Sequence, residues 1–201
     1  MTTLPPTVVV LAGPNGAGKT TAAPRLLRDV FSLAEFVNAD TIAQGLAGFD
    51  PELAALEAGA VMFDRIRQLS ALRRSFAFET TLASRSLAPW IAELMQTGYR
   101  FRLVFLWLHT ADFAVQRVTD RVRLGGHEVS EATVRRRYSR GLQNLFHLYQ
   151  PMATTWRMYD NTDVKFVRLI AEGRRNETPM ISNWQLWARI RGEHFHDESR
   201  A

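Results

Sequence analysis

The chain has 201 residues, of which 46% are hydrophobic and 22% are charged, and its formal net charge is +5. These values are typical of one soluble globular domain with its own core. No stretch approaches the ~20 apolar residues that a membrane span needs, so no membrane partner is expected. The chain has no cysteine, which excludes disulfides and thiolate chemistry and is compatible with the cytoplasm, where we expect the protein.

The positive charge comes almost entirely from arginine, because Lys19 and Lys165 are the only lysines. An excess of positive charge attracts anionic substrates. No basic run is interleaved with aromatic residues, so the sequence favours a nucleotide over a nucleic acid as partner.

The first predicted element is a buried strand over residues 8–11, which leads into a phosphate-binding loop. Residues 13–20 match G-x-x-x-x-G-K-[ST] at every fixed position. The glycines let the backbone wrap a phosphate, and the helix that follows adds its dipole. Lys19 is expected to reach the β- and γ-phosphates, and the Thr20 hydroxyl to hold Mg²⁺. The residues predicted to bind a nucleoside triphosphate are Gly13, Asn15, Gly16, Ala17, Gly18, Lys19, Thr20 and Thr21.

Helices and strands then alternate, which predicts a parallel α/β sheet with right-handed crossovers. We expect one P-loop domain over residues 1–201, with a polar, weakly helical tail over 172–201 that frays or packs on a partner. The strands are expected at residues 35–40, 75–78, 101–108 (beside the first strand), 156–161 and 164–171. The helices are expected at residues 19–30 (interrupted or kinked by Pro24), from Asp50 to Leu72, at 87–97, at 111–124, and from Ser130 to about Tyr149.

Two carboxylates follow predicted strands, at the sheet edge where ligands bind in such folds. Asp40 ends the second strand and could accept a proton from a substrate hydroxyl, or cap a short helix over residues 41–46. Glu79 ends the third strand beside Thr81 and could hold a Mg²⁺-bound water or a substrate hydroxyl, or cap the next helix. We favour a functional role for both carboxylates.

Residues from about 121 to 141 are predicted to form a helical lid. Gly125 and Gly126 separate two helices that carry arginines, and His127 is expected to form hydrogen bonds within the lid. A closing lid would supply positive charge to phosphates and exclude water. For any one arginine, a solvated basic face is an equal alternative. The arginines concerned are Arg117, Arg121, Arg123, Arg135, Arg136, Arg137 and Arg140.

These motifs together resemble the zeta-toxin family of P-loop kinases, and more closely its compact branch, often labelled as predicted ABC-type ATPases. The resemblance rests on residues 13–20, 37–40, 78–81 and 125–138 and covers about residues 7–170. It implies an adenylate-kinase-like core that uses ATP and Mg²⁺ to phosphorylate a hydroxyl of a small molecule, with UDP-N-acetylglucosamine as the leading acceptor. It also implies an antitoxin protein as a partner.

The resemblance implies roles for individual residues as well. Asp40 would be the catalytic base, and Glu79 with Thr81 would bind the acceptor. Thr80 stands where the best-studied toxins often have glycine. Residues 160–161 would lie at the adenine-facing loop or form a plain turn. Lys19 and Arg121 are assigned to catalysis and Thr20 to the metal. A second phosphate-clamping arginine is one of Arg136, Arg137 and Arg140, because consecutive arginines leave the register open; we assign Arg137 to catalysis and Arg140 to substrate binding.

Other functions remain open on the same residues. The protein could phosphorylate another metabolite or a nucleic-acid end, or it could be a P-loop ATPase switch that acts through a protein partner. The switch is disfavoured, because the sequence has no Leu-Ser-Gly-Gly-Gln-like stretch and no strand that ends in an Asp-Glu pair.

Overall fold

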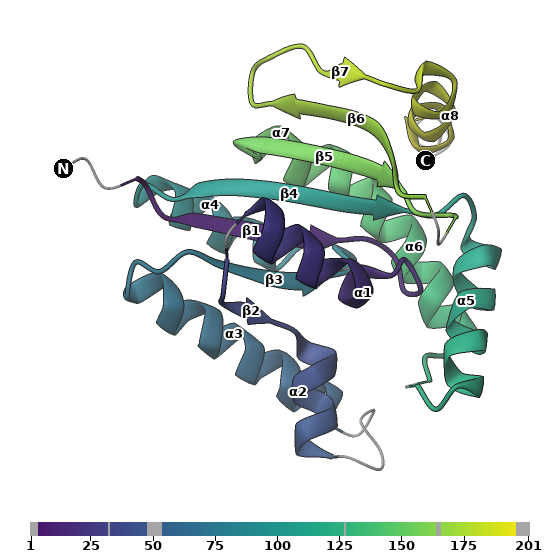
Figure 1. Cartoon of the computed structure of the whole chain (residues 1–201), viewed down its shortest axis with the longest axis horizontal. Helices are drawn as coiled ribbons and strands as arrows, with labels where there is room; N and C mark the ends of the chain where they lie inside the picture. Colours follow the sequence, from purple (N-terminus) through teal and green to yellow (C-terminus); the bar gives the residue numbers. More distant parts are fainter. Residues whose placement is uncertain (1–3, 32, 48–53, 127, 164–165, 196–201) are drawn as a thin grey trace.

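The computed structural model describes residues 4–31, 33–47, 54–126, 128–163 and 166–195 (Figure 1). Within these residues the strands form a seven-stranded sheet in the order β2-β3-β1-β4-β5-β6-β7. Strands β1 to β5 pair in parallel, which confirms the expected sheet, whereas β6 and β7 add an antiparallel edge. The strands are β1 Thr7–Ala12, β2 Phe36–Val37, β3 Phe76–Thr80, β4 Arg100–Trp107, β5 Thr155–Asp160, β6 Arg168–Arg174 and β7 Met180–Ile181.

Helices cover both faces of the central strands. Val8 and Val10 pack into a core with residues of α3 and α4, and Val9 and Leu11 pack into a second core with residues of α1 and α5. A strand covered on both faces is apolar at every position, which explains the run without alternation in β1. The helices are α1 Lys19–Pro24, η1 Arg25–Val30, α2 Ala39–Leu46, α3 Ala55–Ala71, α4 Leu87–Gln96, α5 Ala111–Arg123, α6 Glu131–Asn144, η2 Leu145–Tyr149, α7 Gln150–Met152 and α8 Trp184–Phe195.

The helix expected over residues 19–30 consists of two segments. α1 ends at Pro24, and the chain continues as the π-helical segment η1. A proline inside a helix has no N–H for the hydrogen-bond ladder, and its ring crowds the preceding carbonyl. The wider turn after Pro24 is consistent with this disruption.

Strand β2 is shorter than expected because Asn38 begins a helix. The Asn38 Oδ1 atom accepts hydrogen bonds from the N–H groups of Asp40, at 2.8 Å, and Thr41, at 3.4 Å, and so caps α2. Asp40 lies in the first turn of α2, and the predictions that it ends the strand or caps the helix are wrong. The predicted start of the next helix at Asp50 lies outside the described residues.

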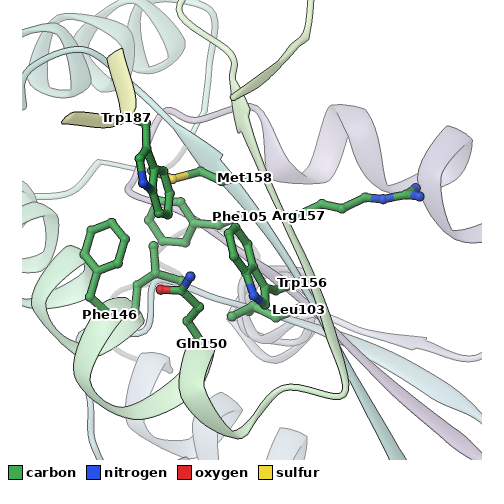
Figure 2. A pocket seen from close by; sticks show the side chains of 9 residues that line it. Leu103, Phe105, Phe146, Gln150, Trp156, Arg157, Met158 and Trp187 are labelled. Carbon is green, nitrogen blue, oxygen red and sulfur yellow. The ribbon is translucent and has the colours of Figure 1, made fainter. Parts of the chain in front are cut away.

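The segment expected to be a polar tail packs on this chain's own core. β6 extends to Arg174, and α8 buries Trp187 and Ile190. Figure 2 shows Trp187 beside Trp156, and the two rings stack with centroids 5.6 Å apart. The cavity lined by these residues has a volume of about 10 Å³, which admits a water molecule and no larger ligand. Among the described helices, none is long and apolar enough to cross a membrane.

Candidate functional site

The phosphate loop follows β1 and leads into α1, as its motif predicts. Gly13 has φ +146°, and a Cβ atom there would collide with the carbonyl oxygen of Leu106 on β4. Gly18 has φ +74°, and a Cβ atom there would lie 2.9 Å from Nδ2 of Asn161. Both positions therefore need glycine for the backbone conformation and for the close approach of neighbouring strands. The first N–H groups of α1 lie at the end of this loop, where an anion would bind.

Asn161, directly after β5, and Arg117, on α5, donate hydrogen bonds to the backbone of the phosphate loop. The Nδ2 atom of Asn161 donates to the Ala17 carbonyl at 2.7 Å, and the Asn161 side chain is buried. Arg117 donates from Nη2 to the Thr162 carbonyl at 2.7 Å and from Nη1 to the Gly16 carbonyl at 3.4 Å. The contact of Asn161 with the loop was not predicted, although its position directly after a strand was a signal. Arg117 thus supports the loop backbone.

Lys19 and Glu79 form a buried ion pair beneath the loop. The Lys19 Nζ atom lies 3.6 Å from Oε1 of Glu79 and donates to the carbonyls of Gly13 and Pro14 at 3.0 Å each. Burial lowers the pKa of Lys19 and raises the pKa of Glu79, and in each case the partner's charge opposes the shift. The side chains are 7% and 9% exposed. This pairing fixes both groups at the carboxyl ends of the central strands.

The other oxygen of Glu79 faces the residue predicted to hold the metal. Glu79 Oε2 accepts hydrogen bonds from Thr20 Oγ1 at 3.0 Å and from Asn38 Nδ2 at 2.9 Å. Hydroxyl and carboxylate oxygens are the ligands that Mg²⁺ prefers, so Thr20 and Glu79 fit a magnesium ion shared with a triphosphate. Asn38, which also caps α2, was not predicted as a site residue, although it lies within the 37–40 motif on which the family resemblance rests.

Asp40 and Arg121 complete this group of charges. Burial is the main cause of the lowered pKa of Lys19; the charge of Arg121 adds to this shift, and the charge of Asp40 opposes it. The charge of Asp40 adds to the rise that burial causes in the pKa of Glu79. The four predicted site residues therefore lie within electrostatic range of one another. Asp40 is exposed, unlike Glu79, and is open to a substrate.

The Gly125–Gly126 break acts as the C-terminal stop of α5. Gly125 has φ +83°, and the N–H of Gly126 donates to the Arg121 carbonyl at 2.9 Å. A Cβ atom on Gly126 would meet the backbone and side chain of Arg121, so glycine lets the chain pass close over this arginine. His127 lies outside the described residues.

Helix α6 is anchored to the core rather than free to swing along its whole length. Val134 is fully buried, and the Tyr138 hydroxyl donates to the Leu108 carbonyl at 2.7 Å. Gly141 packs on the Thr81 carbonyl so closely that a Cβ atom would collide with it. These contacts fix the body of α6 to the core of the domain.

The arginines of α6 differ in their surroundings. Arg135 binds Asp112 at 2.6 Å and Glu131 at 2.7 Å and so joins α6 to α5. Arg137 is half-buried and lies four residues before Gly141, hence on the helix face that packs against Thr81. Arg136 and Arg140 are exposed. Burial therefore favours Arg137 among the arginines between which the sequence left the choice open.

The turn that follows β3, residues 80–84, is held in a strained conformation. Leu82 is fully buried with φ +58°, which costs a non-glycine residue about 1–3 kcal/mol. Asn144 Nδ2 donates to the Leu82 carbonyl at 2.7 Å, and the Tyr149 hydroxyl donates to the Ser84 carbonyl at 2.9 Å. Burial raises the pKa of Tyr149 to about 12, so this hydroxyl remains a donor at neutral pH. α6 and η2 thus hold the turn that carries Thr81.

The sheet, the flanking helices and the phosphate loop define a P-loop kinase-like fold. Within that class, the chain belongs to the AAA domain family (AAA_33), whose match covers residues 8–141. An uncharacterized protein of Haemophilus influenzae (strain ATCC 51907 / DSM 11121 / KW20 / Rd) is 25% identical over 130 residues, which are 65% of this chain and 91% of that protein.

Three solved structures share the fold at low sequence identity. A chain of the AvrRxo1-ORF1:-ORF2 complex with ATP has a TM-score of 0.70 at 16% identity over 92% of this chain, which spans 63% of that chain's length. A chain of the PezAT chromosomal toxin-antitoxin system of Streptococcus pneumoniae has a TM-score of 0.62 at 12% identity, with coverage of 100% and 90%. A putative kinase from Chloroflexus aurantiacus has a TM-score of 0.60 at 12% identity, with 98% of each chain covered.

Proposed function

We propose that this protein is an ATP-dependent phosphotransferase that acts on a hydroxyl of a small molecule. The observation that carries this proposal is the convergence of Lys19, Thr20 and Glu79 beneath the phosphate loop, with the exposed Asp40 at the same sheet edge. The loop over residues 13–20 provides the binding site for the triphosphate. An exposed carboxylate close to the lysine accounts for a second substrate that must lose a proton. The similar chain solved in a complex with ATP supports the choice of nucleotide.

On this proposal, the donor half of the site binds ATP through the loop. Lys19 leaves the carbonyls of Gly13 and Pro14 to bind the β- and γ-phosphates, while Glu79 keeps the Thr20 hydroxyl oriented. A magnesium ion held by Thr20 would neutralise charge on the phosphates. Arg121 and Arg137 add positive charge where the transferring group develops negative charge.

The acceptor half provides the base and excludes water. The acceptor oxygen attacks the γ-phosphorus. The bond between the γ-phosphorus and the β–γ bridging oxygen then breaks, and ADP leaves. Asp40 receives the proton of the acceptor hydroxyl. In this proposal, Thr81, which packs against Gly141 of α6, and the exposed Arg140 bind the acceptor.

We further propose that the protein is zeta-toxin-like, with UDP-N-acetylglucosamine as the leading acceptor and an antitoxin as a partner in the cytoplasm. The motifs at residues 13–20, 37–40 and 78–81 support this proposal, as does the similar fold in a toxin-antitoxin system. The single domain over residues 1–201 and the lid near residues 121–141 are part of the same proposal.

The purified protein with ATP and Mg²⁺ is expected to add one phosphoryl group to UDP-N-acetylglucosamine. Mass spectrometry over a panel of UDP-sugars, nucleosides, free sugars and nucleic-acid ends would identify the acceptor. Lys19→Ala is the matched control, and it is expected to abolish both the product and any growth arrest on expression. ATP consumption with no phosphorylated product across the panel would contradict the phosphotransferase and favour the ATPase switch.

Tyr149→Phe is expected to raise the KM for the acceptor several-fold and leave the KM for ATP unchanged, because it releases the turn over residues 80–84. Tyr99→Phe is the matched control, because its hydroxyl donates to the Arg74 carbonyl at 2.8 Å, away from the phosphate loop. Each loss of one buried hydrogen bond should lower the free energy of unfolding by about 1 kcal/mol. Equal effects of both variants on the acceptor KM would show that Tyr149 contributes stability alone.

A further inference from the structure

A polar groove lies on the face of the sheet that η1 borders, away from the phosphate loop. Its volume is about 500 Å³, and it is lined by the amino-terminal halves of β4 and β5, the end of β6 and Phe31. Figure 1 shows α1 in front of β1, whereas no labelled helix lies in front of β5 and β6. Pockets of about 300–1,000 Å³ are those that small ligands occupy.

The strand register brings two arginines to either side of a hydroxyl on this face. Arg102 on β4 pairs with Thr155 on β5, and Thr155 pairs with Arg174 on β6. Residues directly opposite in neighbouring strands point to the same face, so the three side chains form one row across the sheet. Strands are about 4.8 Å apart, which separates the two arginine backbones by about 10 Å. A tetrahedral anion above Thr155 can be contacted from both sides.

In the neighbouring row of side chains, an arginine pairs with a carboxylate, whereas the row of Arg102, Thr155 and Arg174 contains two arginines and no carboxylate. Arg157 donates from Nε to Oε2 of Glu172 at 2.7 Å, so that pair carries no net charge. Arg102 instead lies over the Phe31 ring, with its guanidinium carbon 5.5 Å from the ring centroid. Among the described residues, no carboxylate lies within 4.0 Å of the Arg102 or Arg174 guanidinium, although Glu177 also lines the groove.

We propose that this groove binds the phosphate group of a small phosphorylated molecule. Arg102, Arg174 and the Thr155 hydroxyl donate to the phosphate oxygens, since guanidinium groups match phosphate in a bidentate geometry. Phe31, Val104 and Met180 lie along the groove beside the uncharged part of the ligand. This site is separate from the phosphate loop, and it stands whether or not the protein is a kinase.

Phenyl phosphate tests this proposal, because it joins a phosphate to a small apolar group. In an NMR titration of the full chain, it should shift the backbone amide signals of Thr155, Gly173 and Arg174. Arg174→Gln should weaken this binding at least tenfold, and Thr155→Val several-fold. Phenol should produce no shift, and benzoate should bind at least fivefold more weakly than phenyl phosphate.

The matched control is Arg168→Gln, which removes the same charge from an exposed position on the same strand, outside the groove. It should leave the affinity within twofold of the wild type, and so should Lys19→Ala. Equal weakening by Arg168→Gln and Arg174→Gln would overturn the proposal in favour of general attraction by a basic surface. Shifts confined to residues 13–20 would overturn it in favour of the phosphate loop alone. Benzoate binding as tight as that of phenyl phosphate would overturn the assignment to phosphate.

Discussion

Asp40→Asn is expected to lower kcat for phosphoryl transfer by about 10²–10⁴-fold while ATP binds with unchanged affinity. A base that accepts the acceptor proton contributes about this factor, and an amide cannot accept that proton. The variant should fold, because Asn38 caps α2. Loss of a carboxylate in the first helical turn should cost only about 0.3–1 kcal/mol of stability.

Calorimetry of ATP binding and single-turnover kinetics separate the two steps for Asp40→Asn. Asp64→Asn is the matched control, because Asp64 is exposed on α3 and its substitution makes the same change in charge. Parallel losses of ATP binding and transfer would give Asp40 a structural role. An unchanged kcat would show that Asp40 is not the general base.

Glu79→Gln is expected to raise the Mg²⁺ concentration for half-maximal activity by about 10–100-fold, with a smaller change in the acceptor KM. Residues that orient a metal ligand typically have effects of this size, and Glu79 Oε2 accepts the hydrogen bond of Thr20. This expectation differs from the acceptor-binding role that the family resemblance implies. An increase in the acceptor KM without a change in the Mg²⁺ requirement would restore that role.

The pH dependence of the Mg²⁺ requirement gives an independent measure. Burial raises the pKa of Glu79 above its usual value, so the carboxylate is lost as the pH falls through this raised pKa. The Mg²⁺ requirement of the wild type should therefore rise as the pH is lowered, while that of Glu79→Gln should change less. Glu93→Gln, at an exposed position on α4, should follow the wild type.

The sequence alone was sufficient to predict the phosphate loop and the class of fold. The loop can be recognised locally, since its glycines, lysine and threonine lie within eight residues and the positive φ angles of Gly13, Gly16 and Gly18 belong to the loop itself. The alternation of apolar strands and helices likewise predicts a parallel sheet, and helix boundaries such as Leu87–Gln96 follow from spacing and stop signals. The antiparallel pairing of β6 was not predictable, because an apolar strand gives no sign of its direction.

Only the tertiary structure decided which side chains meet around that loop. Glu79 reaches Thr20 across 59 positions of sequence, and Asn161 reaches Ala17 across 144. The position of a residue at a strand end predicts the sheet edge on which it lies, but its hydrogen-bond partner depends on strand order and on the approach of neighbouring backbones. For the same reason Asn38, rather than Asp40, caps α2, because the position at which β2 ends decides which side chain reaches the free N–H groups, and the helix begins two residues earlier than predicted. The sequence therefore determined the triphosphate loop, and the packing of distant strands determined the charges that surround it.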